Sequence, residues 1–157
     1  MNRASEVIKR LSGKTLATAE SCTGGGIGAA LTAVPGSSAV YKGGVISYTN
    51  EVKQSVLGVQ RDTLERYGAV SEQVAGQMAA GVRMLLDADI AVSVTGLAGP
   101  TGDEYGNPVG TVFIGYEDAH ATVVRHFCFQ GNRDAVRTQT IEAALELILQ
   151  YNGYTNP

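Results

Sequence analysis

The stretch Thr18-Ala-Glu-Ser-Cys-Thr-Gly-Gly-Gly-Ile-Gly28 leads from a short apolar segment into a run of small residues. We predict a strand over residues 15–20, followed directly by a helix over residues 25–34. The first N–H groups of a helix have no intrahelical partner, so they suit a phosphate or a developing oxyanion. Ser21 would lie at the mouth of this donor cluster. Simple capping of the helix by Ser21 and Thr23 explains the same residues equally well.

Helix and strand patterns alternate along the rest of the chain. Residues 88–97 are almost continuously apolar, which is typical of a strand covered on both faces. Ser71 is expected to cap a longer helix with apolar residues at helical spacing. The other expected elements are a helix around Val7, Ile8 and Leu11, strands over 40–49, 109–116 and 121–129, helices over 51–57, 62–67 and 134–151, and a frayed tail over 152–157. This order indicates one layered α/β domain.

Composition restricts the classes of protein that the chain can belong to. Its 157 residues fit one domain, and 44% hydrophobic with 17% charged residues is typical of a soluble globular protein. The net charge of −3, without a basic run, argues against nucleic-acid binding. No apolar run reaches the roughly 18–20 residues that cross a bilayer, and the N-terminus lacks a signal-peptide core. Cys22 and Cys128 form neither a CxxC pair nor a disulfide framework, so we expect a cytoplasmic protein.

Two nucleotide-binding motifs match in part. Gly24-x-Gly26-x-x-Ala29 fits a loose dinucleotide fingerprint, and Glu51 lies at about the distance expected for a ribose contact. This is weak evidence in a chain with twenty glycines. The segment 12–15 (Ser-Gly-Lys-Thr) resembles the end of a P-loop, but Ile8 stands where that motif needs glycine. The P-loop is therefore rejected.

A serine nucleophile needs a base, and the candidates are few. His120 and His126 lie in or beside a predicted hairpin strand, which makes a Ser-His-Asp triad a poor fit. Tyr48 and Lys53 flank the junction between a predicted strand and helix, so both can point into one cleft. A partly desolvated lysine has a lowered pKa and can deprotonate a serine such as Ser21, with Tyr48 relaying the proton or orienting the serine. Taken singly, a solvated lysine and a packing tyrosine are the commoner explanations.

The glycine- and proline-rich segment 95–110 follows the buried strand, where α/β folds commonly place ligand contacts. Asp103 and Glu104 are adjacent there, without a His or Cys at ligand spacing, so a structural zinc site is not expected. The sequence does not exclude a loosely held Mg²⁺ at these carboxylates. Arg133 and Arg137 share a helix face and could bind a phosphate, although a solvated face is commoner. No organic cofactor is implied.

Several motifs together resemble one known family, the CinA C-terminal domain. They are Thr18-Ala-Glu-Ser-Cys-Thr-Gly-Gly, Tyr48-Thr-Asn-x-x-Lys53, Gly68-Ala-Val-Ser71, Thr95-Gly-x-Ala-Gly-Pro100, Pro108-Val-Gly-Thr-Val112, Phe129-x-Gly-x-Arg133 and Arg137. They cover almost the whole chain in the family's order. The resemblance implies a three-layer α/β/α sandwich with a mixed central sheet and a homodimer or larger assembly. Many relatives carry an additional N-terminal domain, and we expect the stand-alone form here, as a single domain over 1–157.

The resemblance also implies an activity, the hydrolysis of nicotinamide mononucleotide (NMN) to nicotinate mononucleotide and ammonia. It assigns the catalytic roles to Ser21, Tyr48 and Lys53. As a mechanistic hypothesis, we expect N–H groups of residues 22–25 to hold the oxyanion. Cys22, the rival nucleophile, is interpreted as a small packing residue. Residues 101–107 differ from the all-glycine segment of some relatives. We expect the substrate contacts to come from Glu20, Cys22, Thr23, Gly24, Gly25, Thr49, Asn50, Thr95, Gly96, Ala98, Gly99, Arg133 and Arg137.

Two hypotheses compete with this activity. A non-catalytic module would bind the phosphate-bearing ligand with the same glycine segments and never release ammonia. An interaction protein linked to DNA uptake or damage is suggested by the family's competence-related name. The acidic composition argues against direct DNA contact, and a salt-dependent shift of DNA in a gel would argue for it.

Overall fold

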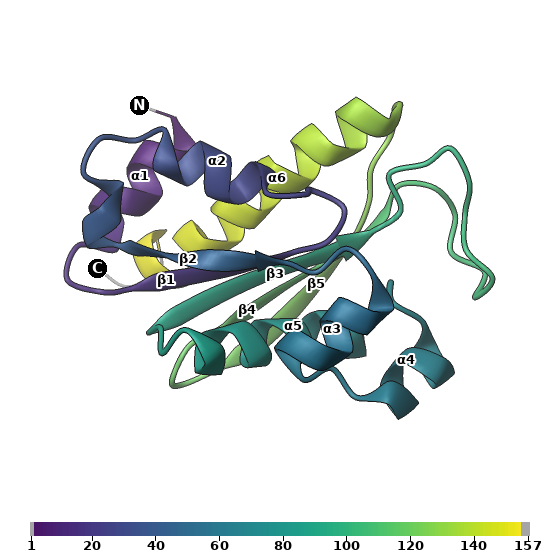
Figure 1. The fold of residues 1–157 in the computed structure, drawn as a ribbon. Helices are drawn as coiled ribbons and strands as arrows, with labels where there is room; N and C mark the ends of the chain where they lie inside the picture. Colours follow the sequence, from purple (N-terminus) through teal and green to yellow (C-terminus); the bar gives the residue numbers. More distant parts are fainter. Residues whose placement is uncertain (1, 155–157) are drawn as a thin grey trace.

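A five-stranded sheet forms the middle of this computed structural model, which describes residues 2–154 (Figure 1). The strands are β1 (Leu16–Glu20), β2 (Tyr41–Ile46), β3 (Ile90–Gly96), β4 (Thr111–Glu117) and β5 (Thr122–Cys128). Their order is β2-β1-β3-β4-β5. β1 pairs in parallel with β2 and β3, whereas β3–β4 and β4–β5 are antiparallel. The prediction of a mixed central sheet is confirmed.

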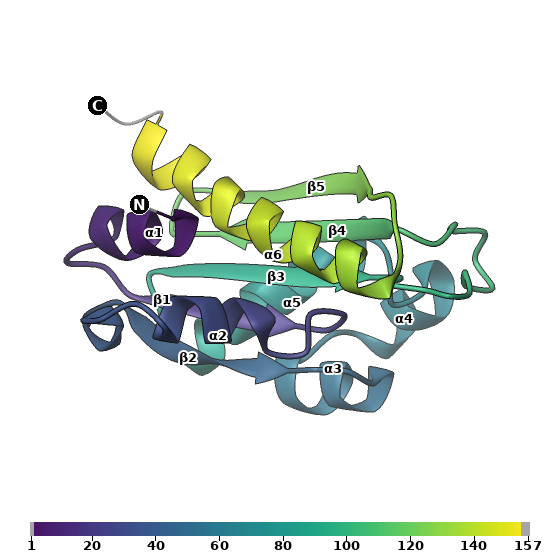
Figure 2. The ribbon, with the colours of Figure 1, turned by 90° about the horizontal axis from the view of Figure 1, so that it is seen from above.

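Helices cover both faces of this sheet (Figures 1 and 2). On one face lie α1 (Arg3–Arg10), α2 (Gly26–Thr32) and α6 (Arg133–Leu149), and on the other lie α3 (Asn50–Leu57), α4 (Arg61–Tyr67) and α5 (Glu72–Leu85). A 3₁₀ turn, Ser37–Ala39, precedes β2, and a π turn, Gln150–Tyr154, follows α6. The predicted three-layer α/β/α architecture is confirmed.

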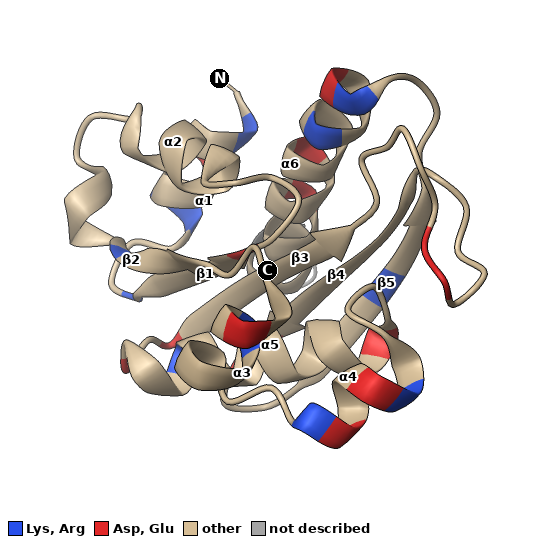
Figure 3. Ribbon diagram, turned by 45° about the vertical axis from the view of Figure 1, so that its right-hand side comes forward, with Lys and Arg blue, Asp and Glu red and all other residues tan. Residues whose placement is uncertain are grey.

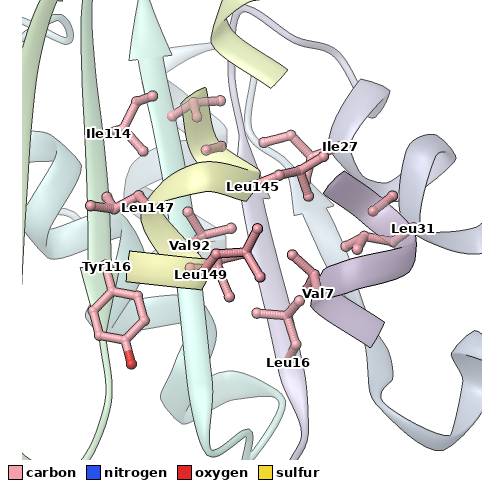
Figure 4. Close-up of a cluster of buried hydrophobic side chains, with 14 of the residues drawn as sticks. Val7, Leu16, Ile27, Leu31, Val92, Ile114, Tyr116, Leu145, Leu147 and Leu149 are labelled. Atoms are coloured by element: carbon pink, nitrogen blue, oxygen red, sulfur yellow. The ribbon is translucent and has the colours of Figure 1, made fainter. Parts of the chain in front are cut away.

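Each face of the sheet has its own apolar cluster, because successive residues of a strand point to opposite faces. Leu16 of β1 belongs to the cluster beneath α1, α2 and α6, whereas Ala17 and Ala19 belong to the cluster beneath α5. Figure 4 shows part of the first cluster, where Leu145 of α6 lies with Val92 of β3. All five residues of β1 are buried, so this strand can supply side chains to either layer.

Most element ends lie within one or two residues of the prediction, as is usual at frayed termini. Ser71 caps α5 as expected, because its Oγ accepts a hydrogen bond from the N–H of Val74. The strand predicted over 40–49 is wrong at its end, since β2 stops at Ile46. Beyond it the Thr49 hydroxyl caps α3, and the Ser47 and Tyr48 carbonyls bond to a lysine amine rather than to a strand.

The expected frayed tail over 152–157 falls partly outside the described residues. Residues 155–157 lie beyond the part of the chain that the structure describes. Asn152 departs from the expectation, because its side-chain amide donates to the Tyr116 hydroxyl and its side-chain oxygen accepts from Lys14. The chain therefore packs against the sheet up to this residue at least.

The carboxylate of Glu20 occupies the N-terminus of α2. Its Oε1 accepts from the Thr23 hydroxyl at 2.6 Å and the Ile27 N–H at 2.8 Å, and its Oε2 accepts from the Gly28 N–H at 3.0 Å. Gly25, the residue before the helix, has φ 102° and no side chain to cap with. A helix N-terminus favours a negative group, and Glu20 supplies it. Because Glu20 is only 2% exposed, this group lies inside the protein. The predicted phosphate or oxyanion cradle is therefore wrong for the N–H groups of Ile27 and Gly28, since an internal carboxylate already binds them.

Replacing Glu20 by Ala removes three hydrogen bonds and leaves buried N–H groups without an acceptor. We expect this variant to lose about 3 kcal/mol of unfolding free energy, measured by urea denaturation. Glu20→Gln, which keeps one acceptor oxygen, should lose less. The matched control is Glu51→Ala on exposed α3, with an expected loss below about 1 kcal/mol. Equal losses at positions 20 and 51 would contradict the role of Glu20.

Candidate active site

A pocket of about 340 Å³ opens where β1 and β3 end and α3 begins. This volume lies at the lower end of the range for small-molecule sites, roughly 300–1,000 Å³. The carboxyl ends of parallel strands are also where open α/β sheets bind ligands. Ten of the sequence-predicted site residues line it: Ser21, Cys22, Tyr48, Asn50, Lys53, Thr95, Gly96, Ala98, Gly99 and Arg133.

Ser21 and Lys53 meet at the inner wall of this pocket. Lys53 Nζ lies 2.9 Å from Ser21 Oγ, and both side chains are buried, Lys53 with only 1% of its surface exposed. Ser21 directly follows β1 and continues its ladder, because its N–H donates to the Val94 carbonyl at 3.0 Å. Lys53 lies on the first turn of α3. The sheet and the helix thus fix the two partners independently.

Burial changes the acid–base behaviour of Lys53. Desolvation, which disfavours the ammonium form, lowers the pKa of Lys53 to about 8. About half of the lysine is therefore neutral near pH 8. Among the described residues that line the pocket no carboxylate restores the charge, since Lys53 and Arg133, both basic, are its ionisable residues apart from Tyr48 and the weakly acidic Cys22 thiol.

The partners of Lys53 Nζ also orient it. Besides Ser21 Oγ, it contacts the carbonyl oxygens of Ser47 at 2.7 Å and Tyr48 at 3.4 Å. Carbonyl oxygens can only accept hydrogen bonds, so in the neutral amine they take up the two N–H groups. The nitrogen lone pair is then left for the one partner that can donate, the hydroxyl of Ser21. This geometry suits removal of a proton from Ser21.

The Tyr48 hydroxyl does not lie where the predicted proton relay needs it. Its hydroxyl accepts a hydrogen bond from the Arg133 guanidinium at 3.0 Å, and the same guanidinium donates to the Gly99 carbonyl at 2.6 Å. Among the described residues, none of its hydroxyl contacts reaches Ser21 or Lys53. The lysine instead binds the backbone carbonyl of Tyr48. Tyr48, 59% exposed, is thus a pocket wall joined to the rim arginine.

Six other residues that were predicted to contact the substrate do not line the pocket. Most of them bind other parts of the protein instead. Glu20 and Thr23 bond to each other below α2. Arg137, predicted for a phosphate or a solvated face, donates to the carbonyls of Cys22 and Thr23 at 3.0 and 3.1 Å. It therefore joins α6 to the segment after Ser21. The remaining residues are Gly24 and Gly25, which belong to that same turn, and Thr49, which caps α3.

Sequence reasoning missed five lining residues: Ala69, Val70, Leu97, Thr101 and Gly102. Ala69 and Val70 lie in the Gly68-Ala-Val-Ser71 motif, so the signal was present without a role attached to it. The Ala69 carbonyl accepts from Thr95 Oγ1 at 2.8 Å, which explains why this turn reaches the end of β3. The other three belong to the glycine- and proline-rich segment that was predicted to hold ligand contacts.

Cys22 lines the pocket and also packs in the core beneath α2 and α6. Burial raises the pKa of the Cys22 thiol to about 11, so the reactive thiolate is scarce at neutral pH. This favours Ser21 as the nucleophile. Over residues 2–154, the His, Cys, Asp and Glu side chains nowhere gather in threes suited to a metal ion. Within the same range, every helix is too short or too polar to span a bilayer.

Comparisons with known proteins agree on one family. The CinA C-terminal domain profile matches residues 2–152. A CinA-like protein of Thermotoga neapolitana is 50% identical over 145 residues, covering 90% of this chain and 35% of that protein. The chain thus spans about a third of the length of the curated relatives it matches.

Solved structures show the same fold. A competence-damaged protein (CinA) superfamily protein from Escherichia coli superposes with a TM-score of 0.93 at 36% identity, over 95% of this chain and 88% of that one. A superfamily member from Klebsiella pneumoniae gives 0.92 at 37% identity, over 94% of both chains. Fold and pocket define an α/β domain in which a buried lysine contacts a serine at a strand end. The chain belongs to the CinA C-terminal domain family.

Proposed function

We propose that this chain is a nicotinamide-nucleotide amidohydrolase, which converts NMN and water into nicotinate mononucleotide and ammonia. The observation that carries the proposal is the 2.9 Å contact between Lys53 Nζ and Ser21 Oγ inside a ligand-sized pocket. Lys53 would be the base, the role that histidine has in Ser-His enzymes. The family resemblance supplies the bond to be cleaved, the carboxamide of the pyridine ring.

In the first half of the reaction, neutral Lys53 takes the Ser21 proton as Oγ attacks the carboxamide carbon. The Cys22 N–H adjoins the nucleophile and donates to no backbone carbonyl among the described residues, so it can donate to the oxyanion. One such donor contributes roughly 3–4 kcal/mol in known enzymes. As the C–N bond breaks, the Lys53 ammonium returns the proton to the leaving nitrogen, and ammonia departs.

In the second half, water hydrolyses the ester formed on Ser21. Lys53 is neutral again and takes a proton from the attacking water, then returns it to Ser21 Oγ as the ester bond breaks. The products are the free serine and the nicotinate carboxyl group. The base and the nucleophile thus serve both halves without a further group.

The charge of the pocket supports an anionic substrate. Lys53 enters the reaction as the neutral amine, whereas Arg133, which is basic, lies at the exposed rim. After bonding to Gly99 and Tyr48, its guanidinium still has N–H groups to offer a phosphate. The exposed ring of Tyr48 offers a flat surface beside it for a pyridine ring or ribose. A cytoplasmic location and assembly into homodimers or larger oligomers belong to the same proposal.

The direct test is to incubate the protein with NMN and to measure the release of ammonia and nicotinate mononucleotide by chromatography. We expect Ser21→Ala to lower kcat/KM by at least about 10³-fold, because the attacking oxygen is gone. Ser55→Ala, an exposed serine two residues from Lys53 on α3, is the matched control and should retain activity within two-fold. Full activity in Ser21→Ala would eliminate the mechanism.

The pH dependence tests the role of Lys53. Only the neutral amine accepts a proton, so kcat/KM should rise with pH and reach half of its maximum near pH 8, in line with the lowered pKa. Below this pH it should fall about ten-fold per unit. Lys53→Arg keeps the positive charge at every accessible pH and should be inactive from pH 6 to 10. A flat wild-type profile over pH 6–9 is the outcome that contradicts Lys53 as the base.

The same assay separates the competing hypotheses. Tight NMN binding without any ammonia would favour a non-catalytic nucleotide-binding module. A protein that contacts DNA directly should present a basic stripe. In the view of Figure 3, basic and acidic positions instead lie next to one another on α4 and at the start of α6, in agreement with a net charge of −3.

A further inference from the structure

The segment between β3 and β4 forms one wall of the pocket. This pocket loop (residues 97–110) contributes Leu97, Ala98, Gly99, Thr101 and Gly102 to the lining. It projects past the end of the sheet on the side of α4 (Figures 1 and 2). The loop is rich in glycine, and among its residues only Ala98 and Gly110 are buried. Its own packing therefore contributes little to its position, and contacts with other elements must fix it.

Tyr105, at the outer part of the pocket loop, binds the C-terminal end of α4. Its hydroxyl donates to the Glu65 carbonyl at 2.9 Å, with the Leu64 carbonyl 3.3 Å away as a second acceptor. Its ring covers Gly68, where an added Cβ would lie 2.5 Å from the ring. Carbonyls at a helix C-terminus lack intrahelical donors, so the tyrosine hydroxyl satisfies the Glu65 carbonyl, while the Leu64 carbonyl also accepts from the Gly68 N–H.

A second anchor holds the inner part of the pocket loop. Asn107 Nδ2 donates to the Val70 carbonyl at 3.1 Å and to Asp103 Oδ2 at 2.8 Å. Asp103 Oδ1 accepts from the N–H groups of Tyr105 and Asn107 at 3.0 and 2.9 Å. Asp103 thereby closes the loop into a turn that presents Tyr105 to α4. Val70 itself lines the pocket, so the anchor connects two of its walls.

We propose that Tyr105 is a positioning residue, which sets the width of the substrate pocket by fixing the pocket loop to α4. The inference rests on the proposed function, because it concerns how the same pocket holds NMN. Ser21 and Lys53 are held by β1 and α3, and Tyr105 contacts neither of them. Release of the loop should therefore weaken substrate binding and leave the chemical step almost unchanged.

Kinetics of Tyr105 variants measure this effect on NMN hydrolysis. Tyr105→Ala should raise KM about ten-fold with kcat within two-fold of wild type. Tyr105→Phe keeps the ring on Gly68 and should raise KM about three-fold. The matched control is Tyr67, a neighbouring tyrosine with 43% of its surface exposed against 42% for Tyr105. Tyr67→Ala and Tyr67→Phe should leave both constants within two-fold, and an equal rise of KM at both positions would overturn the proposal.

Amide hydrogen exchange tests the anchor without any substrate. In the ligand-free protein, N–H groups over residues 98–107 should exchange at least about five-fold faster in Tyr105→Ala, whereas those of β1 should not change. Unchanged exchange in the loop overturns the proposal. Faster exchange with an unchanged KM overturns the effect on pocket width. If wild type fails to hydrolyse NMN, the proposed function fails, while faster loop exchange still supports the anchor.

Discussion

Removal of the Lys53 amine from water is the constraint on which the candidate site depends. An ammonium group loses its hydration when it is buried, and this loss lowers the pKa of Lys53 to about 8. The protein accommodates the group by turning the chain after β2, so that the carbonyls of Ser47 and Tyr48 face its nitrogen. The early end of β2 and the contact with Ser21 go together with this arrangement, while the Thr49 hydroxyl caps the start of α3. One buried amine therefore links local backbone geometry to the chemistry of the pocket.

Much of the fold could be predicted from the sequence, because its signals are local. The apolar run that contains β3, the Ser71 cap and the apolar spacing of α5 each act within a few residues. The place of Ser21 at a strand end beside Lys53 was also within reach, since the glycine-rich turn and the shortage of suitable histidines restrict the candidates. The family motifs then placed Tyr48 and Arg133 in the same region, although without their mutual hydrogen bond.

The missed features depend on contacts that sequence patterns do not show, some within one turn, as at Glu20, and others between segments far apart in the chain. Nothing near Glu20 shows that its carboxylate turns back under α2, and a glycine-rich helix start looks the same with an internal or an external anion. Arg137 contacts carbonyls more than a hundred residues away. Tyr105 and Asn107 reach α4 and Val70 across about forty residues. Spacing along the chain carries no information on such pairs, so sequence patterns identify the residues but not their partners.

The alternation of side chains along β1 has a consequence for how this domain can evolve. Glu20 reaches the helix layer above the sheet, and Ser21, the next residue, meets Lys53 on the opposite side. Successive side chains point to opposite faces of the sheet, so one face receives the structural carboxylate and the other receives the serine of the candidate site. Loss or gain of a single residue inside β1 would exchange the two, with the carboxylate facing the lysine and the serine beneath α2. We therefore expect insertions and deletions to be tolerated in the loops around this strand and not within it.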